Sequence, residues 1–164
     1  MNSVRDIRAM LPEGMRLTPD GKPRAMEYFV YGGELLPLSA GARNTQNISI
    51  QNDADFVVFS AFGRVSDPAD ETTVVSDPAI TVEIRDTSSG ANWHNAPQAF
   101  GGVFSVTGLA AGGAAGLSGV YPFSRIVKAG GSIATTFANL LGATDRNVRY
   151  GYRVFKVYYH AADV

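Results

Sequence analysis

The sequence predicts an all-β fold, in the form of a single antiparallel β-sandwich. Glycine and proline, which number 18 and 8 in the 164-residue chain, interrupt it every few residues. The segments between these interruptions are rich in Val, Ile, Phe, Tyr and Thr, residues that suit a pleated and half-buried strand. Long stretches with helical periodicity are nearly absent. A chain of this length is large enough to bury a substantial core as one domain.

The N-terminal part differs from the rest, and we expect an extended N-terminal arm at 1–26 followed by the sandwich domain at 27–164. Ser3 and Asp6 have the spacing of a capping box, which predicts a short helix. One face of this helix would carry the apolar residues Val4, Ile7, Met10 and Leu11. A helix this short is marginal alone in water, so the arm either frays or becomes ordered by docking on a neighbouring subunit through these residues.

The clearest strand is predicted in the segment AITVEIRD, where Ile80, Val82 and Ile84 alternate with polar residues and face inward. The segment 56–65 is apolar on both faces at its start, which is typical of a central sandwich strand. Between these strands, residues 66–78 contain two Asp-Pro pairs and several acidic positions. We expect them to form a long exposed loop.

Further strands are expected at 27–31, 47–51, 121–127 and 132–140. The last strand should place one group of residues on a common face: Val148, Tyr150, Tyr152 and Val154. The apolar pattern then changes, which predicts a β-bulge near Val154 and Phe155.

Two segments share one order of features, LSAGARNTQNISIQNDADFVVF and VKAGGSIATTFANLLGATDRNVRY. Each has an apolar residue, an Ala-Gly pair, an alternating strand, a polar turn and a long strand. This similarity suits two equivalent halves of one antiparallel sandwich. With long connections near 67–78 and 86–122, the pattern indicates a jelly roll or a related Greek key.

The most unusual segment is GLAAGGAAGLSG at 108–119. It lacks the Lys and the flanking βα unit of a phosphate-binding loop, and it is too short to cross a bilayer. We expect a long inter-strand loop that becomes ordered at an interface, where a small surface lets another chain approach the backbone. Leu109 and Leu117 would anchor its two ends.

No motif predicts catalysis or a metal site. The chain has two histidines and no cysteine, so it cannot supply the clustered ligands of a cupin-type metal centre. It has no G-x-S-x-G elbow and no EF-hand loop. A pair of glycosidase carboxylates on separate strands would leave no spacing signature, so a hydrolase remains a minor alternative.

The aromatic residues in or beside loops are Trp93, Phe100 and Tyr121. They could stack on a sugar, but a sandwich core or a subunit interface normally uses such residues, which is the interpretation we favour. With Leu109 and Leu117 they form the predicted partner-binding loop surface. No cofactor is expected.

The formal charge of −1 argues against a nucleic-acid partner. The absence of cysteine excludes disulfides, and the charged N-terminus does not resemble a secretory signal. No stretch approaches the length of a membrane helix. We therefore expect a soluble protein that is made in a cytoplasm and has no membrane partner.

The succession of LPLSAGARNTQNISIQNDADFVVFSAFGRV, ITVEIRDTSSGANWHN, YPFSRIVKAGGSIATTFANL and VRYGYRVFKVYY resembles the capsid cement or decoration proteins of tailed bacteriophages. These proteins are built on a jelly roll and bind over a shell of HK97-type major capsid protein. The similarity covers roughly residues 27–160 and includes no catalytic motif.

The resemblance implies a non-enzymatic virion structural protein that bridges major capsid protein subunits and pairs with copies of itself as a dimer or trimer. It would be assembled in the host cytoplasm and lie on the capsid surface. Residues 1–26 and 100–121 would staple adjacent subunits. The alternative is a receptor- or carbohydrate-binding module of a head fibre or tail, which would expose aromatic residues around Trp93.

Overall fold

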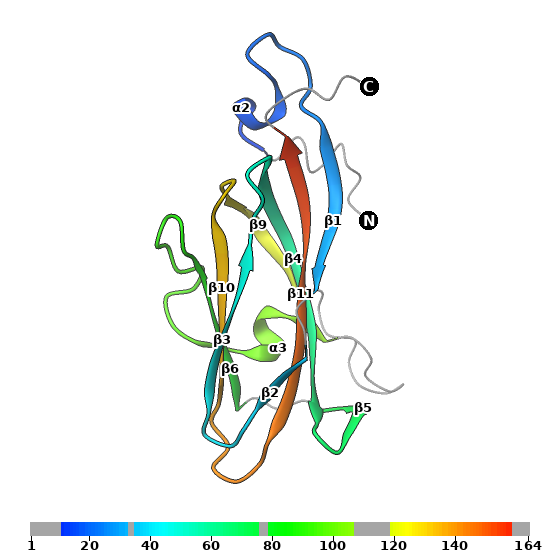
Figure 1. Cartoon of the computed structure of the whole chain (residues 1–164), viewed down its shortest axis with the longest axis vertical. Helices are drawn as coiled ribbons and strands as arrows, with labels where there is room; N and C mark the ends of the chain where they lie inside the picture. Colours follow the sequence, from blue (N-terminus) through cyan, green and yellow to red (C-terminus); the bar gives the residue numbers. More distant parts are fainter. Residues whose placement is uncertain (1–10, 33–34, 76–78, 107–118, 159–164) are drawn as a thin grey trace.

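The computed structural model describes residues 11–32, 35–75, 79–106 and 119–158, with no side chains described at 105–106 and 119–124. Two mostly antiparallel sheets pack face to face, which confirms the predicted all-β sandwich (Figure 1). The larger sheet contains β1 (Met26–Gly32), β11 (Arg146–Tyr158), β4 (Ala54–Asp67) and β5 (Asp70–Val74) in that order. The smaller sheet contains β3 (Arg43–Ser49), β10 (Ser132–Asn139), β6 (Ile80–Asp86) and β7 (Gln98–Ala99).

Three further strands complete the seven-stranded larger sheet. β2 (Leu36–Leu38) pairs with β11. β9 (Gly119–Val127) and the short β8 (Ser105–Val106) both pair with β4, so they share its border with β5. β4 is thus a central strand, as its apolar sequence predicted.

The space between the sheets holds an aromatic core. Tyr150 and Tyr152 of β11 lie against Phe104 and Phe137, with ring centroids of Phe137 and Tyr150 4.9 Å apart. The single-turn helix α3 (Phe100–Val103) lies between the two layers in Figure 1 and buries its first and last side chains. The predicted inward positions of β6 and β11 are all buried: Ile80, Val82, Ile84, Val148, Tyr150, Tyr152 and Val154.

A second apolar cluster covers part of the outer face of the large sheet, meaning the face directed away from the small sheet. Leu11 and Met15 are only 4% and 9% exposed and pack with Val57, Phe155 and Val157. The single-turn helix α2 (Glu13–Arg16) presents Met15 to this cluster. The expected extended arm is therefore wrong for residues 11–25, because these strand residues are apolar on their outer face and need a cover.

The second cluster also explains the change of pattern near Val154. Phe155 and Val157 simply face outward, onto the N-terminal segment. The ladder between β11 and β4 does shift between Arg153 and Val154, but the extra residue is Phe59 of β4. The predicted bulge is thus correctly placed along the ladder and wrongly assigned to β11.

The segment predicted as an exposed loop at 66–78 contains β5. Asp67 and Asp70 face each other across the turn that joins β4 to β5. The carboxylate of Asp70 accepts hydrogen bonds from the backbone and hydroxyl of Thr72 and from the hydroxyl of Thr73. These bonds hold the turn, and the β-branched residues after it favour a strand.

The two similar segments form equivalent halves, as predicted. One half is β3 with β4, and the other is β10 with β11; β3 pairs with β10 in the small sheet, and β4 pairs with β11 in the large sheet. Each half starts at its Ala-Gly pair, where the glycine has a positive φ of 70° at Gly41 and 73° at Gly130. Only glycine adopts this conformation without strain, which explains why the pair recurs.

Each Ala-Gly turn is fastened by an aspartate of the other half. The backbone N–H of Ala40 donates to Oδ1 of Asp145 at 2.8 Å, and that of Ala129 donates to Oδ1 of Asp55 at 2.9 Å. Asp55 is buried and also binds Nζ of Lys128 at 2.8 Å. We call these two hydrogen bonds the crossed turn contacts.

Candidate functional site

β1 is an edge strand that exposes apolar side chains. It pairs with β11 on one side, and no described strand pairs with its other side. Tyr28, Phe29 and Val30 are 50%, 38% and 44% exposed. Together with Leu140 they are the exposed large apolar residues of the described ranges. Contiguous exposed apolar residues of this kind mark interaction surfaces.

The side chains of β1 alternate between the two faces of the large sheet. Tyr28 and Val30 lie on the outer face, where their cross-strand neighbours are Phe155 and Arg153. The Tyr28 ring contacts Phe59 and Phe155, with centroid distances of 6.2 and 5.8 Å. The exposed edge is therefore continuous with the aromatic part of the outer face.

On the opposite face of β1, Phe29 closes the border of the sandwich. Its ring lies 5.0 Å from that of Tyr31 and 4.7 Å from Nζ of Lys156. Lys156 is only 7% exposed and donates to Oε1 of Gln51 at 3.1 Å. Burial raises the pKa of Tyr31, and the charge of Asp53 adds to this effect. The inner side of the edge is thus a packed surface that can support a docked chain.

β1 lacks the features that usually keep an edge strand from pairing. Its sequence MEYFVYG contains no Lys or Pro, and its ladder with β11 has no bulge. Glu27, its one charged residue, accepts a hydrogen bond from Tyr158 Oη at 2.5 Å. This hydrogen bond raises the pKa of Tyr158 to about 12, with smaller effects of burial and charge. The edge is therefore open to the addition of a further strand.

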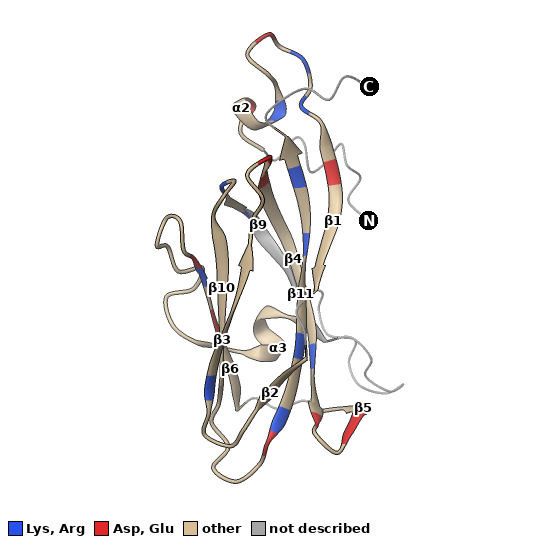
Figure 2. Cartoon of the chain, viewed as in Figure 1, with Lys and Arg blue, Asp and Glu red and all other residues tan. Residues whose placement is uncertain are grey.

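The outer face of the large sheet is aromatic near one end of its strands and basic farther along them, where arginines follow the aromatic residues. Arg153 is opposite Val30, and Arg149 is opposite Arg64 of β4. Figure 2 shows basic positions distributed along β11. Phe62 separates the arginines, and the Arg153 guanidinium lies 4.9 Å from its ring centroid.

A polar groove crosses the outer face of the small sheet. Its floor is the central strand β10, where Ala134 and Thr136 are small. Longer side chains on the flanking strands form its walls, including Arg43, Glu83 and Arg85, and the hollow measures about 550 Å³. Arg43 and Glu83 form an ion pair across it.

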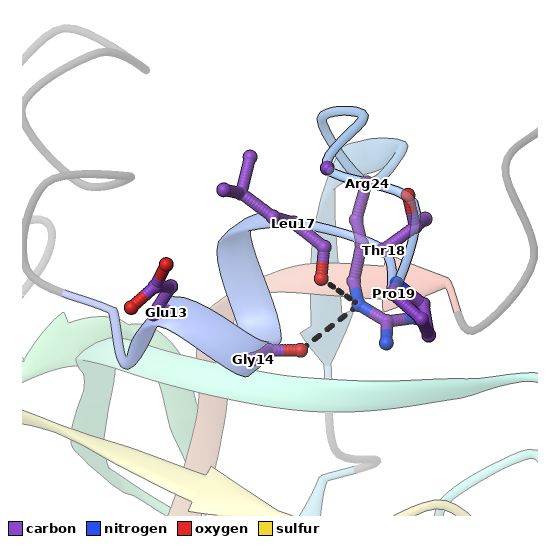
Figure 3. Close-up of a pocket in the computed structure, with 7 residues that line it drawn as sticks. Glu13, Gly14, Leu17, Thr18, Pro19 and Arg24 are labelled. Atoms are coloured by element: carbon purple, nitrogen blue, oxygen red, sulfur yellow. Dashed lines mark hydrogen bonds between the residues drawn. The ribbon is translucent and has the colours of Figure 1, made fainter.

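A smaller hollow of about 280 Å³ lies beside α2 (Figure 3). Arg24 points into this region, and its Nε donates to the carbonyl oxygens of Gly14 and Leu17 at 3.0 and 3.2 Å. These bonds join the end of α2 to the chain that enters β1. The hollow thus belongs to the turn that fixes the N-terminal segment.

The structure does not bring the predicted partner-binding residues together on the surface. Trp93 and Phe100 are only 6% and 2% exposed because both fill the core, and Leu11 is buried in the second cluster. Their assignment as contact residues is therefore corrected. Residues outside the described ranges are Val4, Ile7, Met10, Leu109 and Leu117, and the side chain of Tyr121 is also not described.

Sequence reasoning missed the exposed edge and the arginines. The run EYFVY is apolar on both faces, which indicates a strand but not its position at the border of a sheet. Arg64 lies far from Arg149 and Arg153 in the chain, and only the pairing of β4 with β11 makes Arg64 and Arg149 neighbours. No local pattern contains this information.

The described part of the chain contains no group of three or more His, Asp or Glu residues that could hold a metal ion. His94 is partly buried, and burial followed by the charge of Arg125 lowers its pKa. No helix among the described residues is long and apolar enough to span a bilayer.

Comparison with known proteins gives no match to this chain, either among protein-family models or among curated proteins.

Proposed function

We propose that this chain is a non-enzymatic structural protein of a virion, which cements or decorates a tailed-phage capsid by bridging major capsid protein subunits. The main observation behind the proposal is the edge strand β1. It exposes Tyr28, Phe29 and Val30 and lacks the features that usually prevent an edge strand from pairing with a strand of another chain. A strand of a neighbouring subunit could extend the sheet there, which combines backbone hydrogen bonds with apolar contacts. Repeated over a shell, modest contacts of this kind add up through multivalency.

We further propose that the sandwich is a jelly roll. The strand order supports it: four strands of the larger sheet follow the order β1-β11-β4-β9, and the smaller sheet has the order β3-β10-β6-β7. Two four-stranded antiparallel layers linked by Greek-key connections define that fold. In a copy whose β1 does not pair with a capsid subunit, the same open edge offers the surface for the proposed pairing with a second copy, because Tyr28 and Val30 would be opposite each other in a two-fold pair centred on Phe29.

Replacing Val30 with Lys tests the role of the edge. The ammonium group would be placed on the exposed outer face of β1, where it should oppose strand addition without disturbing the core. We expect binding to shells assembled from the major capsid protein of the same phage, measured by co-sedimentation, to fall at least about tenfold. Leu140→Lys is the matched control, because Leu140 is 66% exposed and directly follows β10 of the other sheet.

Unchanged shell binding of V30K, or an equal loss in L140K, would contradict this role of the edge. A wild-type chain that does not sediment with the shells would contradict the cement function itself. Circular dichroism and thermal unfolding of each variant establish that the sandwich remains folded.

The polar groove favours a second candidate, a receptor- or carbohydrate-binding module of a head fibre or tail. A groove with two arginines and a glutamate above a small-residue floor could bind the hydroxyl groups of a sugar. Trp93 cannot contribute the expected aromatic platform because it is buried. Saturable binding of the chain to immobilised glycans, lost in Glu83→Gln, would support this candidate.

A further inference from the structure

We propose that the outer face of the large sheet binds an acidic segment of the capsid subunit through Arg64, Arg149 and Arg153, which we call the arginine surface. This inference deepens the proposed function and rests on it for the source of the segment. The reason for a binding role is an excess of positive charge that the described part of the chain does not neutralise.

The ladder between β4 and β11 places two arginines directly opposite each other. Arg64 is the cross-strand partner of Arg149, and Arg153 is opposite Ser60 on the same face. Like charges in directly opposite positions destabilise a sheet. A pair of this kind is therefore a cost to folding that a bound anion would remove.

The contacts of the arginines leave this charge only partly compensated. Arg149 has one carboxylate nearby, with its Nη2 3.8 Å from Oε2 of Glu71. Both partners of this ion pair are about half exposed, at 51% and 45%, so solvent weakens it. Nη1 of Arg153 donates to the hydroxyl of Ser60 at 3.3 Å, which is a neutral acceptor.

Arg64 gives the strongest evidence for an anion-binding role of the arginine surface. Its Nε is buried and has no hydrogen-bond partner in the structure, although a buried N–H group that lacks an acceptor is costly. The residue as a whole is only partly buried, so part of it faces solvent. A carboxylate that accepts from Nε and from one terminal nitrogen would satisfy it in the bidentate geometry typical of Arg.

The local shape leaves room for such a carboxylate. A hollow of about 240 Å³ is lined by Phe62, Gly63, Arg64, Arg149 and Tyr150. Gly151 maintains this arrangement, because a Cβ atom there would lie 2.5 Å from Cζ of Phe62. The Phe62 ring therefore rests on the backbone of β11, between the two parts of the arginine surface.

The surroundings favour a protein segment over a polyphosphate. The arginine surface borders the apolar edge, since Arg153 is the cross-strand partner of Val30. A peptide can offer acidic and apolar side chains side by side, whereas the phosphate backbone of a nucleic acid cannot match the apolar part. The net charge of −1 also provides little long-range attraction for a nucleic acid.

Titration with an acetylated deca-glutamate peptide at low salt tests the proposal. We expect the Nε–Hε signals of Arg64 and Arg149 in ¹⁵N-correlated NMR spectra to shift, while that of Arg43 on the small sheet stays in place. The double variant Arg64→Gln/Arg149→Gln should bind the peptide at least about tenfold more weakly. The matched control Arg43→Gln/Arg85→Gln removes the same charge from the other sheet and should change affinity by less than about twofold.

Equal weakening in both double variants would overturn the proposal, because the binding would then depend on overall charge. Tighter binding of a deca-thymidine oligonucleotide or of inorganic phosphate at Arg64 would also overturn it. Peptide binding that survives while shell co-sedimentation fails would contradict the cement function and retain the arginine surface. Normal shell binding by the Arg64/Arg149 variant would leave the cement function standing and remove the arginine surface from it.

Discussion

Individual carboxylates show how strongly this fold depends on polar turns. Asp86, at the end of β6, accepts hydrogen bonds from the hydroxyl groups of Ser88 and Ser89, both at 2.6 Å, and from their backbone N–H groups. Burial, the largest single effect, raises the pKa of this carboxyl. The hydrogen bonds from Ser88 and Ser89 together outweigh burial, so the pKa is lowered overall.

This lowered pKa predicts a specific loss of stability in acid. Because the folded-state pKa of Asp86 lies below its ordinary value of 3.8, its contribution is fully present above that pH and is lost as the pH falls through the folded value. Urea unfolding at pH 6 and pH 3 should therefore show a larger decrease in the free energy of unfolding for the wild type than for Asp86→Asn. Equal decreases would show that other groups dominate the acid response.

At the scale of elements, the crossed turn contacts make unequal contributions. Asp55 is buried at the start of β4, whereas Asp145 is exposed. Asp55→Ala would leave the partly buried N–H of Ala129 without its acceptor and should lower the free energy of unfolding by about 2 kcal/mol. Asp145→Ala, the matched control at the equivalent turn, should cost less than about 1 kcal/mol, because water can replace the lost acceptor. Chemical denaturation measures both, and a larger effect at Asp145 would contradict this assignment.

The elements also show which features a sequence can specify. β6 was predictable because one of its faces is buried and the other is in contact with solvent. This arrangement imposes a strict alternation of apolar and polar residues. The facing of β11 was harder to predict from the sequence. Its residues Phe155 and Val157 are covered by the N-terminal segment, which lies more than a hundred positions away in the chain. The apolar pattern of β11 indicates that both of its faces are buried, but it does not indicate what covers them. A bulge in β11 was therefore the simplest local explanation of the pattern.

The candidate site was less predictable than the fold, because it also depends on contacts between segments that lie far apart in the chain. Exposure of Tyr28 and Val30 follows from the position of β1 at the border of the large sheet, which is a property of the assembled sheet. The aromatic residues chosen from loops, Trp93 and Phe100, are needed in the core because α3 and its neighbours fill the space between the layers. Local sequence identified strands well and did not distinguish a core aromatic from a surface one.

For the whole molecule, the N-terminal segment must be divided at Leu11 when its function is tested. Deleting residues 1–26 would uncover Val57, Phe155 and Val157, and it should lower the free energy of unfolding by more than about 3 kcal/mol. Deleting only residues 1–10 retains Leu11 and Met15 and is the proper test of a capsid-binding arm. We expect that shorter variant to fold and to lose shell binding in co-sedimentation. Normal binding by it would contradict the stapling role of the arm.

The crossed turn contacts have a consequence for how the molecule comes apart. Because Asp55 holds the turn before β10 and Asp145 holds the turn before β3, neither half keeps its own first turn fastened without the other. The halves also share both ladders, since β3 pairs with β10 and β4 pairs with β11. Partial opening of one half therefore weakens the other, which makes the sandwich a single cooperative unit. Under a mechanical load, such a unit either stays folded as a whole or unfolds as a whole.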